Sequence, residues 1–411
     1  MAELCLTSGG ARQIPLSPHE PRVLHQQQSK DAANTSSTTM FIEDEVHGII
    51  CLPDHIKEIV DHPLFQRLKN VNQLGLIPSL RPDANHKRYD HCLGTYNSAK
   101  DHLNALEHNS RNFQPKLPNW CRNAVEIAAL LHDIGHGAFS HVWECVCQGQ
   151  FDHESNSVAC VDTIFADVQS PELVKLREDQ NGRGVQLIKA LILGCKEMLA
   201  FPMLGHTYIF DIVHNRRCGL DVDKWDYLRR DNKRLGILND KEMDFDQIFL
   251  KSRIGPDGQY IEYRYEDYHR IYRLFMARWR LHLDVYQTPK VLAMDQILKS
   301  LIHHIQPELK TVRAQDGDAW LELYDQSIFE LIAKHPKSIY LRQTQRLREC
   351  SEEDAGAEKN DNIIRVQTEI HGPGKVMMPD ESYPLYGDKC KKRQIVRYLM
   401  PTKINKVFQM D

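Results

Sequence analysis

The stretch LLHDIGHGAFSH, residues 130–141, decides how this chain is interpreted. It ends an apolar run that predicts a buried helix from Asn123 to Asp133. The two glycines that follow Asp133 predict the end of this helix. Adjacent residues on a helix point about 100° apart, but a turn at the glycines lets His132 and Asp133 reach one metal ion.

Two other segments offer the further ligands that such a metal site needs. Upstream, HKRYDHCLG places His91 at the head of a predicted helix, and downstream GLDVDKWDYLRRD supplies Asp223. A histidine such as His91, taken alone, is more often a core residue. The order H, HD, D nevertheless predicts one set of four ligands. Nitrogen and oxygen ligands suit Mn, Fe or Zn, with Mg less typical, so the pattern predicts a metal centre and leaves its ion open.

Histidines beyond the HD pair predict acid–base chemistry beside the metal. His136 and His141 follow within eight residues, and His153 comes shortly after. Glu144 is one helical turn from His141. A carboxylate that holds a histidine keeps it in one tautomer and lets it pass a proton to a leaving oxygen. The alternative is that Glu144 is simply exposed.

Two helical stripes predict a substrate cavity. Each has three residues at i, i+4 and i+8, which share one helix face: Asp223, Tyr227 and Asp231, then Arg278, His282 and Tyr286. Arginine can hold a phosphate with two hydrogen bonds, and a tyrosine can stack on a sugar. Lys224, beside the first stripe, could also meet a phosphate. The alternatives are a surface helix with ion pairs for the first stripe, and a surface arginine with a buried tyrosine for the second.

Composition favours an ordinary globular protein. The chain has 411 residues and a net charge of −4, so its charge does not indicate binding to nucleic acid, although a local basic groove stays open. It has no apolar run long enough to predict a membrane span. Its 11 cysteines are irregularly spaced, which predicts free thiols and an intracellular, reducing compartment.

Several motifs now resemble one known family. They are DEVHGII, FQRLKNVNQLG, NHKRYDHCLG, LLHDIGHGAFSH, GLDVDKWDYLRRD and RWRLHLDVYQ, and they run from about Phe41 to Lys290. In this order they resemble the HD-domain deoxynucleoside triphosphate (dNTP) triphosphohydrolases, most of all the animal enzymes with a sterile-alpha-motif domain, for which no counterpart is expected ahead of residue 41. The resemblance implies that a dNTP and water give a deoxynucleoside and inorganic triphosphate, within dNTP catabolism and innate immunity.

The resemblance also implies a role for each matching residue. The implied metal ligands are His91, His132, Asp133 and Asp223. The cleavage site would hold His136, His141 and His153, with Glu144 where the family has Asp. Phosphates would meet Arg88, Lys224 and Arg278, and the sugar and base would meet Gln73, Leu74, Tyr227, Asp231, His282 and Tyr286.

Regulation by nucleotides is a further implication. In the family, nucleotides such as GTP bind between subunits and drive assembly, so dNTP and GTP regulators and a homodimer or homotetramer are expected. Asp61 and Gln66 match residues that read guanine, Lys69 stands in place of an arginine, and Arg253 matches a regulatory arginine. The implied location is the nucleus, the cytoplasm or both.

We predict a mainly α fold, an HD-domain helical bundle with a smaller α+β C-terminal lobe. The expected parts are a disordered tail at 1–40, an HD domain at 41–300, and a lobe at 301–411 with an acidic linker near 351–361. One long helix is expected from Glu266 to Leu298. Two other functions stay open: a different HD phosphohydrolase, such as a nucleotidase or cyclic nucleotide phosphodiesterase, or a catalytically silent HD protein that binds nucleotide or single-stranded nucleic acid.

Overall fold

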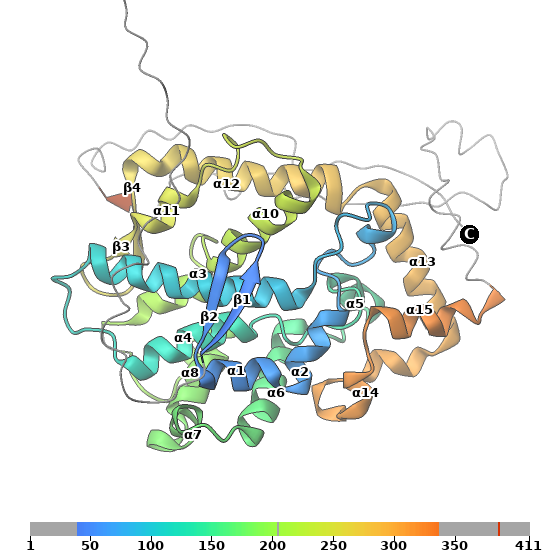
Figure 1. Ribbon diagram of the computed structural model, residues 1–411, viewed down its shortest axis with the longest axis horizontal. Helices are drawn as coiled ribbons and strands as arrows, with labels where there is room; N and C mark the ends of the chain where they lie inside the picture. The colour runs from blue at the N-terminus through green and yellow to red at the C-terminus, as the bar shows by residue number, and fades with distance from the viewer. Residues whose placement is uncertain (1–38, 204, 337–384, 387–411) are drawn as a thin grey trace, which may run out of the picture. The chain divides into compact units, whose positions relative to one another are not determined.

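The computed structural model describes residues 39–203 and 205–336 and a short strand at 385–386 (Figure 1). Within these residues the fold is mainly α, as predicted. The expected tail at 1–40, apart from its last two residues, and the acidic linker at 351–361 lie outside the described residues. The boundary expected near residue 300 stays a prediction, and residue 300 itself lies within a helix.

The α-helices of the described residues follow one another along the chain, and the longest connection between them joins α2 to α3. They are α1 Asp54–Asp61, α2 Pro63–Gln66, α3 Arg88–Asn109, α4 Asn119–Leu131, α5 His141–Val146, α6 His153–Asp167, α7 Pro171–Glu178, α8 Arg183–Ile192, α9 Phe210–Val213, α10 Val222–Leu235, α11 Asp246–Leu250, α12 Tyr268–Leu281, α13 Pro289–Ile305, α14 Asp318–Leu321 and α15 Asp325–Ala333.

The strands form two small sheets. β1 Met40–Asp44 and β2 Gly48–Leu52 make an antiparallel hairpin in which Met40 faces Leu52. β3 Arg253–Ile254 pairs antiparallel with β4 Ile261–Arg264, and β5 Leu385–Tyr386 pairs parallel with β4. The β1–β2 turn matters for the site, because it carries His47 to helix α10.

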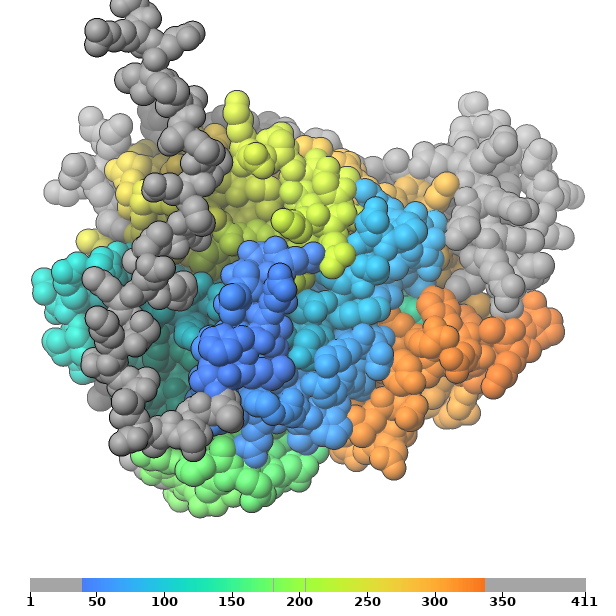
Figure 2. Space-filling view, in the orientation of Figure 1, coloured from blue at the N-terminus to red at the C-terminus, as the bar shows by residue number. Residues whose placement is uncertain are grey.

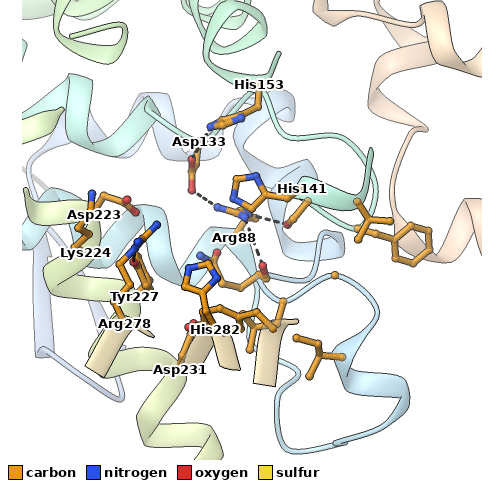
Figure 3. A pocket seen from close by; sticks show the side chains of 18 of the residues that line it. Arg88, Asp133, His141, His153, Asp223, Lys224, Tyr227, Asp231, Arg278 and His282 are labelled. Carbon is orange, nitrogen blue, oxygen red and sulfur yellow. Dashed lines mark hydrogen bonds and ion pairs between the residues drawn. The ribbon is translucent and has the colours of Figure 1, made fainter. Parts of the chain in front are cut away.

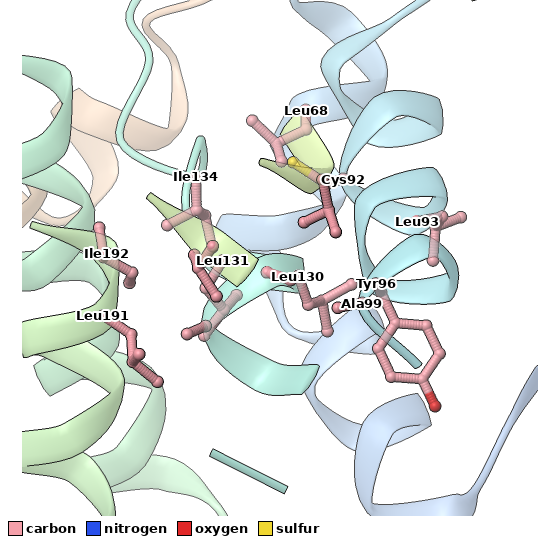
Figure 4. Packing of buried hydrophobic residues seen from close by; sticks show 14 of the residues in the cluster. Leu68, Cys92, Leu93, Tyr96, Ala99, Leu130, Leu131, Ile134, Leu191 and Ile192 are labelled. Carbon is pink, nitrogen blue, oxygen red and sulfur yellow. The ribbon is translucent and has the colours of Figure 1, made fainter. Parts of the chain in front are cut away.

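The core that positions the site is built around α4. From Ala124 to Leu131 this helix is almost entirely apolar, and all its apolar side chains there are buried. It packs between α3 and α8 (Figure 4). Helix α3 packs in turn against α10. Since α4 ends at Leu131, this packing fixes the position of His132 and Asp133, and it brings α3 and α10 beside them.

The prediction of one long helix from Glu266 to Leu298 is wrong. The chain forms α12 to Leu281, a π-helical turn at His282–Tyr286, and then a separate helix, α13. Pro289 is the cause, because a proline disfavours the helical conformation at the residue before it, and Thr288 is extended with φ −66° and ψ 149°. The break lets α13 leave the line of α12 and pack against α5 (Figure 1).

None of the helices in the described ranges combines the length and the apolar character that a membrane span requires. All cysteines in these ranges are free thiols, as expected.

Candidate active site

Four side chains from three helices meet at one point. His91 comes from α3, His132 and Asp133 directly follow α4, and Asp223 lies in the first turn of α10. His91 Nε2 lies 3.1 Å from Asp223 Oδ1 and 3.3 Å from Asp133 Oδ2, and His132 Nε2 lies 3.3 Å from that same Asp133 atom. One ligand atom from each residue lies within 4.8 Å of all the others. The structure therefore brings together the four residues of the predicted metal site.

The chemistry of this cluster fits a metal ion. The Nε2 atoms of His91 and His132 are buried and have no hydrogen-bond partner. Burial lowers the pKa of His91, but the close carboxylates of Asp133, Asp223 and Asp226 outweigh burial and hold that pKa well above its ordinary value. The carboxylates thus make the cluster favourable for a cation. Two imidazole nitrogens and two carboxylates suit a divalent or transition metal ion.

A second layer of charged residues holds His91. Asp226 accepts from the ring at 2.7 Å between its Oδ2 and His91 Nδ1, and it also meets His47 and Arg230. Arg230 in turn reaches Asp44 Oδ2 at 2.9 Å. This arrangement leaves His91 Nε2 facing the metal position, as in many metal sites. Asp226 is not among the residues predicted from the sequence, although its place three residues after Asp223 on α10 was the available signal.

We expect Asp226→Asn to lower metal affinity about 10–100-fold, because the amide no longer holds His91 by charge. Isothermal titration calorimetry with Mn²⁺ measures the metal affinity of each variant. In this variant the guanidinium of Arg230 stays paired with the carboxylate of Asp44, so no buried charge is left without a partner at Arg230. The matched control is Asp44→Asn, which touches the same arginine but not His91. Equal losses in the two variants would show that the network acts on folding and not on the ligand.

A group of three histidines and one carboxylate lies beside the metal ligands. The rings of His136 and His153 are stacked with centres 4.0 Å apart, and His141 meets both of them edge-on. Glu144 joins the group, with Oε1 at 2.6 Å from His153 Nδ1 and Oε2 at 3.0 Å from His141 Nδ1. In this structure the glutamate is therefore a shared partner of two histidines.

The electrostatics separate the members of this group. Burial lowers the pKa of His136 well below its ordinary value, and the charges of Arg88 and His153 lower it further, so this ring is neutral. Burial lowers the pKa of His153, but the bond to Glu144 and the charges of Asp133 and Glu144 together outweigh burial, so this pKa lies above its ordinary value. Burial raises the pKa of Glu144, and its bonds to His141 and His153 lower it more, so it stays a carboxylate.

Three basic residues line the same cavity, which has a volume of about 650 Å³. Arg88 Nε donates to Ser140 Oγ at 2.8 Å, and its guanidinium also contacts Asp133. Lys224 Nζ lies 3.0 Å from Asp221, and Arg278 Nε donates to the Tyr227 hydroxyl at 3.2 Å. Figure 3 shows these three cations around the space in front of Asp133 and Asp223. This volume is typical of a small-molecule site.

The two predicted stripes face this cavity from α10 and from the end of α12. The Tyr286 hydroxyl donates to Asp231, whose other oxygen lies 2.7 Å from His86 Nε2. Burial and Arg278 lower the pKa of His282 to about 3, so this ring is neutral. Gln73 and Leu74 also line the cavity, and Gln73 Oε1 is buried without a hydrogen-bond partner.

The residues expected to bind a regulatory nucleotide lie away from this cavity. Lys69 Nζ lies 4.6 Å from the centre of the Tyr89 ring, and that tyrosine also interacts with Gln66 and Asp61. Arg253 lies on β3 and pairs with Glu262. Figure 1 shows β3 well separated from α2, so one copy of the chain does not gather all four residues.

Comparison with known proteins agrees with this geometry. Residues 88–179 match the HD domain family. An HD domain-containing protein of Acanthamoeba polyphaga mimivirus is 30% identical over 300 residues, which cover 70% of this chain and 63% of that protein. The deoxynucleoside triphosphate triphosphohydrolase SAMHD1 of Xenopus laevis is 32% identical over 278 residues, 62% of this chain and 43% of the relative. SAMHD1 of Homo sapiens is 32% identical over 272 residues, 61% and 42% respectively.

Residues 88–179 therefore match the HD domain, and the H, HD and D residues of the candidate metal site lie on α3, after α4 and on α10. The similarity of the chain to proteins named deoxynucleoside triphosphate triphosphohydrolase extends well beyond the HD segment. The chain nevertheless spans less than two thirds of the length of each of these relatives.

Proposed function

We propose that this protein is a metal-dependent dNTP triphosphohydrolase, which converts a dNTP and water into a deoxynucleoside and inorganic triphosphate. One observation supports this most. Three of the four candidate metal ligands (His132, Asp133 and Asp223), three cations and two tyrosine-bearing stripes border one cavity of about 650 Å³. The cations suit a chain of phosphates, and the tyrosines suit a sugar. The names of the SAMHD1 relatives agree with this substrate class.

The residues of the chain divide the work in the proposed reaction. Arg88, Lys224 and Arg278 hold the phosphates and offset the charge that grows on them in the transition state. Water attacks the α-phosphorus, and the bond from that phosphorus to the 5′ oxygen breaks. His141 gives the 5′ oxygen its proton, and Glu144 keeps His141 oriented. A bound Mn, Fe, Zn or Mg ion at the four ligands would supply Lewis acidity.

The assay that tests the function uses the purified full chain. Each dNTP is incubated with Mn²⁺ or Mg²⁺, with and without GTP, and the products are separated by anion exchange. We expect deoxynucleoside and triphosphate in equal amounts. Monophosphate and pyrophosphate would indicate another HD phosphohydrolase. Binding of metal and dNTP without any product would indicate a silent HD protein, and either outcome would refute the proposal.

Selection of deoxyribose depends on Tyr286 in this proposal. In this proposal its ring packs against the sugar of the substrate. A ribose 2′-hydroxyl would therefore clash with the ring or be buried without the water that hydrates it in solution. We expect Tyr286→Ala to narrow the preference in kcat/KM for dATP over ATP at least about tenfold. Tyr286→Phe is the control, because it keeps the ring and removes only the hydroxyl that donates to Asp231. If the alanine variant rejects ATP as strongly as the wild type, Tyr286 does not select the sugar.

Regulation is proposed by resemblance alone. Asp61, Gln66 and Lys69 would bind GTP or a dNTP, with Arg253 supplied by a second copy in a homodimer or homotetramer. An intracellular location, in the nucleus, the cytoplasm or both, belongs to the same proposal.

A further inference from the structure

The segment at residues 314–333, which includes α14 and α15, packs onto the loop that joins Asp133 to His141. The backbone N–H of Ala314 donates to Asn156 Oδ1 at 2.9 Å, and Asn156 Nδ2 donates to the Gly135 carbonyl at 3.0 Å. Further along, the Phe329 ring lies edge-on to the Phe139 ring, with centres 4.9 Å apart. Figure 2 shows the orange segment of α14 and α15 against the blue segment that holds α2. The segment therefore contacts this loop directly at Phe139 and is linked to it through Asn156 at Gly135.

Arg67 makes a second connection between these parts. Its guanidinium donates to the carbonyl of Leu323 at 2.9 Å and to the carbonyl of His136. It also lies 4.2 Å from the centre of the Trp320 ring. This buried cation therefore joins the loop between α14 and α15 to the loop that carries His136.

Asp325 is the most specific of these contacts. Its side chain is only 4% exposed, and its two oxygens accept from two backbone N–H groups: Oδ1 from Phe139 at 2.6 Å and Oδ2 from Asn72 at 2.9 Å. Phe139 lies 186 positions away in the sequence. A buried carboxylate is costly unless it is hydrogen-bonded, so this one is tied to both loops.

Both loops held by Asp325 support Arg88. Ser140, next to Phe139, accepts from Arg88 Nε at 2.8 Å, and the carbonyl of Gln73, next to Asn72, accepts from the same guanidinium at 3.4 Å. Ser140 Oγ also donates to the Asn72 carbonyl at 2.6 Å. Arg88 therefore lies in a cradle whose two sides meet at Asp325.

The cradle needs an external anchor because its backbone is strained. Phe139 and Ser140 both have φ of +59°, a left-handed conformation that side chains with a Cβ rarely adopt. Such residues persist only when their surroundings hold them. Without Asp325, the N–H of Phe139 would be a buried donor in an already strained turn.

We infer that Asp325 is a positioning residue of the active site, which fixes the two loops around Arg88 and so sets where the substrate's phosphates bind. The role of Arg88 rests on the proposed function. The active site is accordingly completed by the C-terminal segment and not by the HD segment at 88–179 alone.

Asp325→Asn tests this inference, because the amide keeps one acceptor oxygen and turns an N–H₂ group toward the other backbone donor. Glu330→Gln is the matched control, an exposed carboxylate-to-amide change on the same helix. Hydrogen–deuterium exchange should be at least about tenfold faster at Asn72 and Phe139 only in Asp325→Asn. Its kcat/KM for dNTP should fall about 100-fold, mostly through KM, with Mn²⁺ content unchanged.

If Asp325→Asn leaves exchange at Asn72 and Phe139 unchanged, Asp325 does not anchor the two loops. If exchange is faster but kcat/KM equals that of Glu330→Gln, Asp325 does not position the active site. If the wild type makes no triphosphate, the proposed function fails, but exchange and dNTP affinity by titration still decide the inference. Phe329→Leu serves if Asp325→Asn does not fold. It removes the ring contact with Phe139 alone, so exchange should rise about Phe139 and not about Asn72.

Discussion

The double variant His132→Ala, Asp133→Ala is expected to lose both bound metal and triphosphate release, with kcat/KM at least about 1,000-fold below the wild type. Two of the four ligands disappear, and so does the carboxylate that His91, His132 and Arg88 all contact. The two remaining ligands, His91 and Asp223, cannot hold an ion as four do. Elemental analysis of the purified protein measures the metal, and anion exchange measures triphosphate.

A second His–Asp pair supplies the control. His62 and Asp167 lie 3.3 Å apart at the surface, so their double alanine variant removes the same chemical groups away from the cavity. Chelation of the wild-type protein tests the metal without a change of sequence. The activity of the wild type should vanish on chelation and return when Mn²⁺ is added, whereas the double variant should stay inactive with added Mn²⁺. Thermal unfolding checks that the variant is folded. Triphosphate release by a folded, metal-free variant would remove the metal centre from the mechanism.

The metal ligands could be predicted from sequence because each lies on a helix whose packing is also written in the sequence. The apolar face of α4 is visible as an uninterrupted run up to Leu131, and it fixes the HD pair. The stripe on α10, and the one that runs from α12 into the π-helical turn, were visible for the same reason, since i, i+4 and i+8 share a face along a helix. Helical periodicity thus carries local geometry and needs no knowledge of the fold.

Contacts made by distant segments could not be predicted in this way. Asp325 meets Phe139 across 186 positions, and nothing near either residue marks the pairing. His47 reaches Asp226 only because the β1–β2 hairpin turns toward α10. The break between α12 and α13 is different, since Pro289 was visible and its effect on Thr288 was predictable. The four residues of the candidate metal site could thus be predicted from the sequence, whereas the residues that hold them in place became visible only in the fold.

Replacing His141 with asparagine is expected to lower kcat about 100–10,000-fold with little change in KM. The side chain is 67% exposed and lines the cavity, where it can reach a leaving oxygen. The phosphate-binding cations are untouched, so substrate affinity should remain. Glu144→Gln should lower kcat less than His141→Asn does, because both histidines remain and lose only the carboxylate between them. Steady-state kinetics on one dNTP measures both variants, and His304→Asn, a change at an exposed histidine on α13, is the control.

The choice of leaving atom separates proton donation from a merely structural role of His141. In a dNTP with sulfur in place of the 5′ bridging oxygen, the thiolate leaves without a proton, so a general acid has little to contribute. The loss of kcat in His141→Asn should therefore shrink to less than about tenfold on the sulfur analogue. An equal loss on both substrates would show that His141 positions other groups, and the proton would then have to come from elsewhere in the histidine group, with His153 on the same carboxylate the next donor to test.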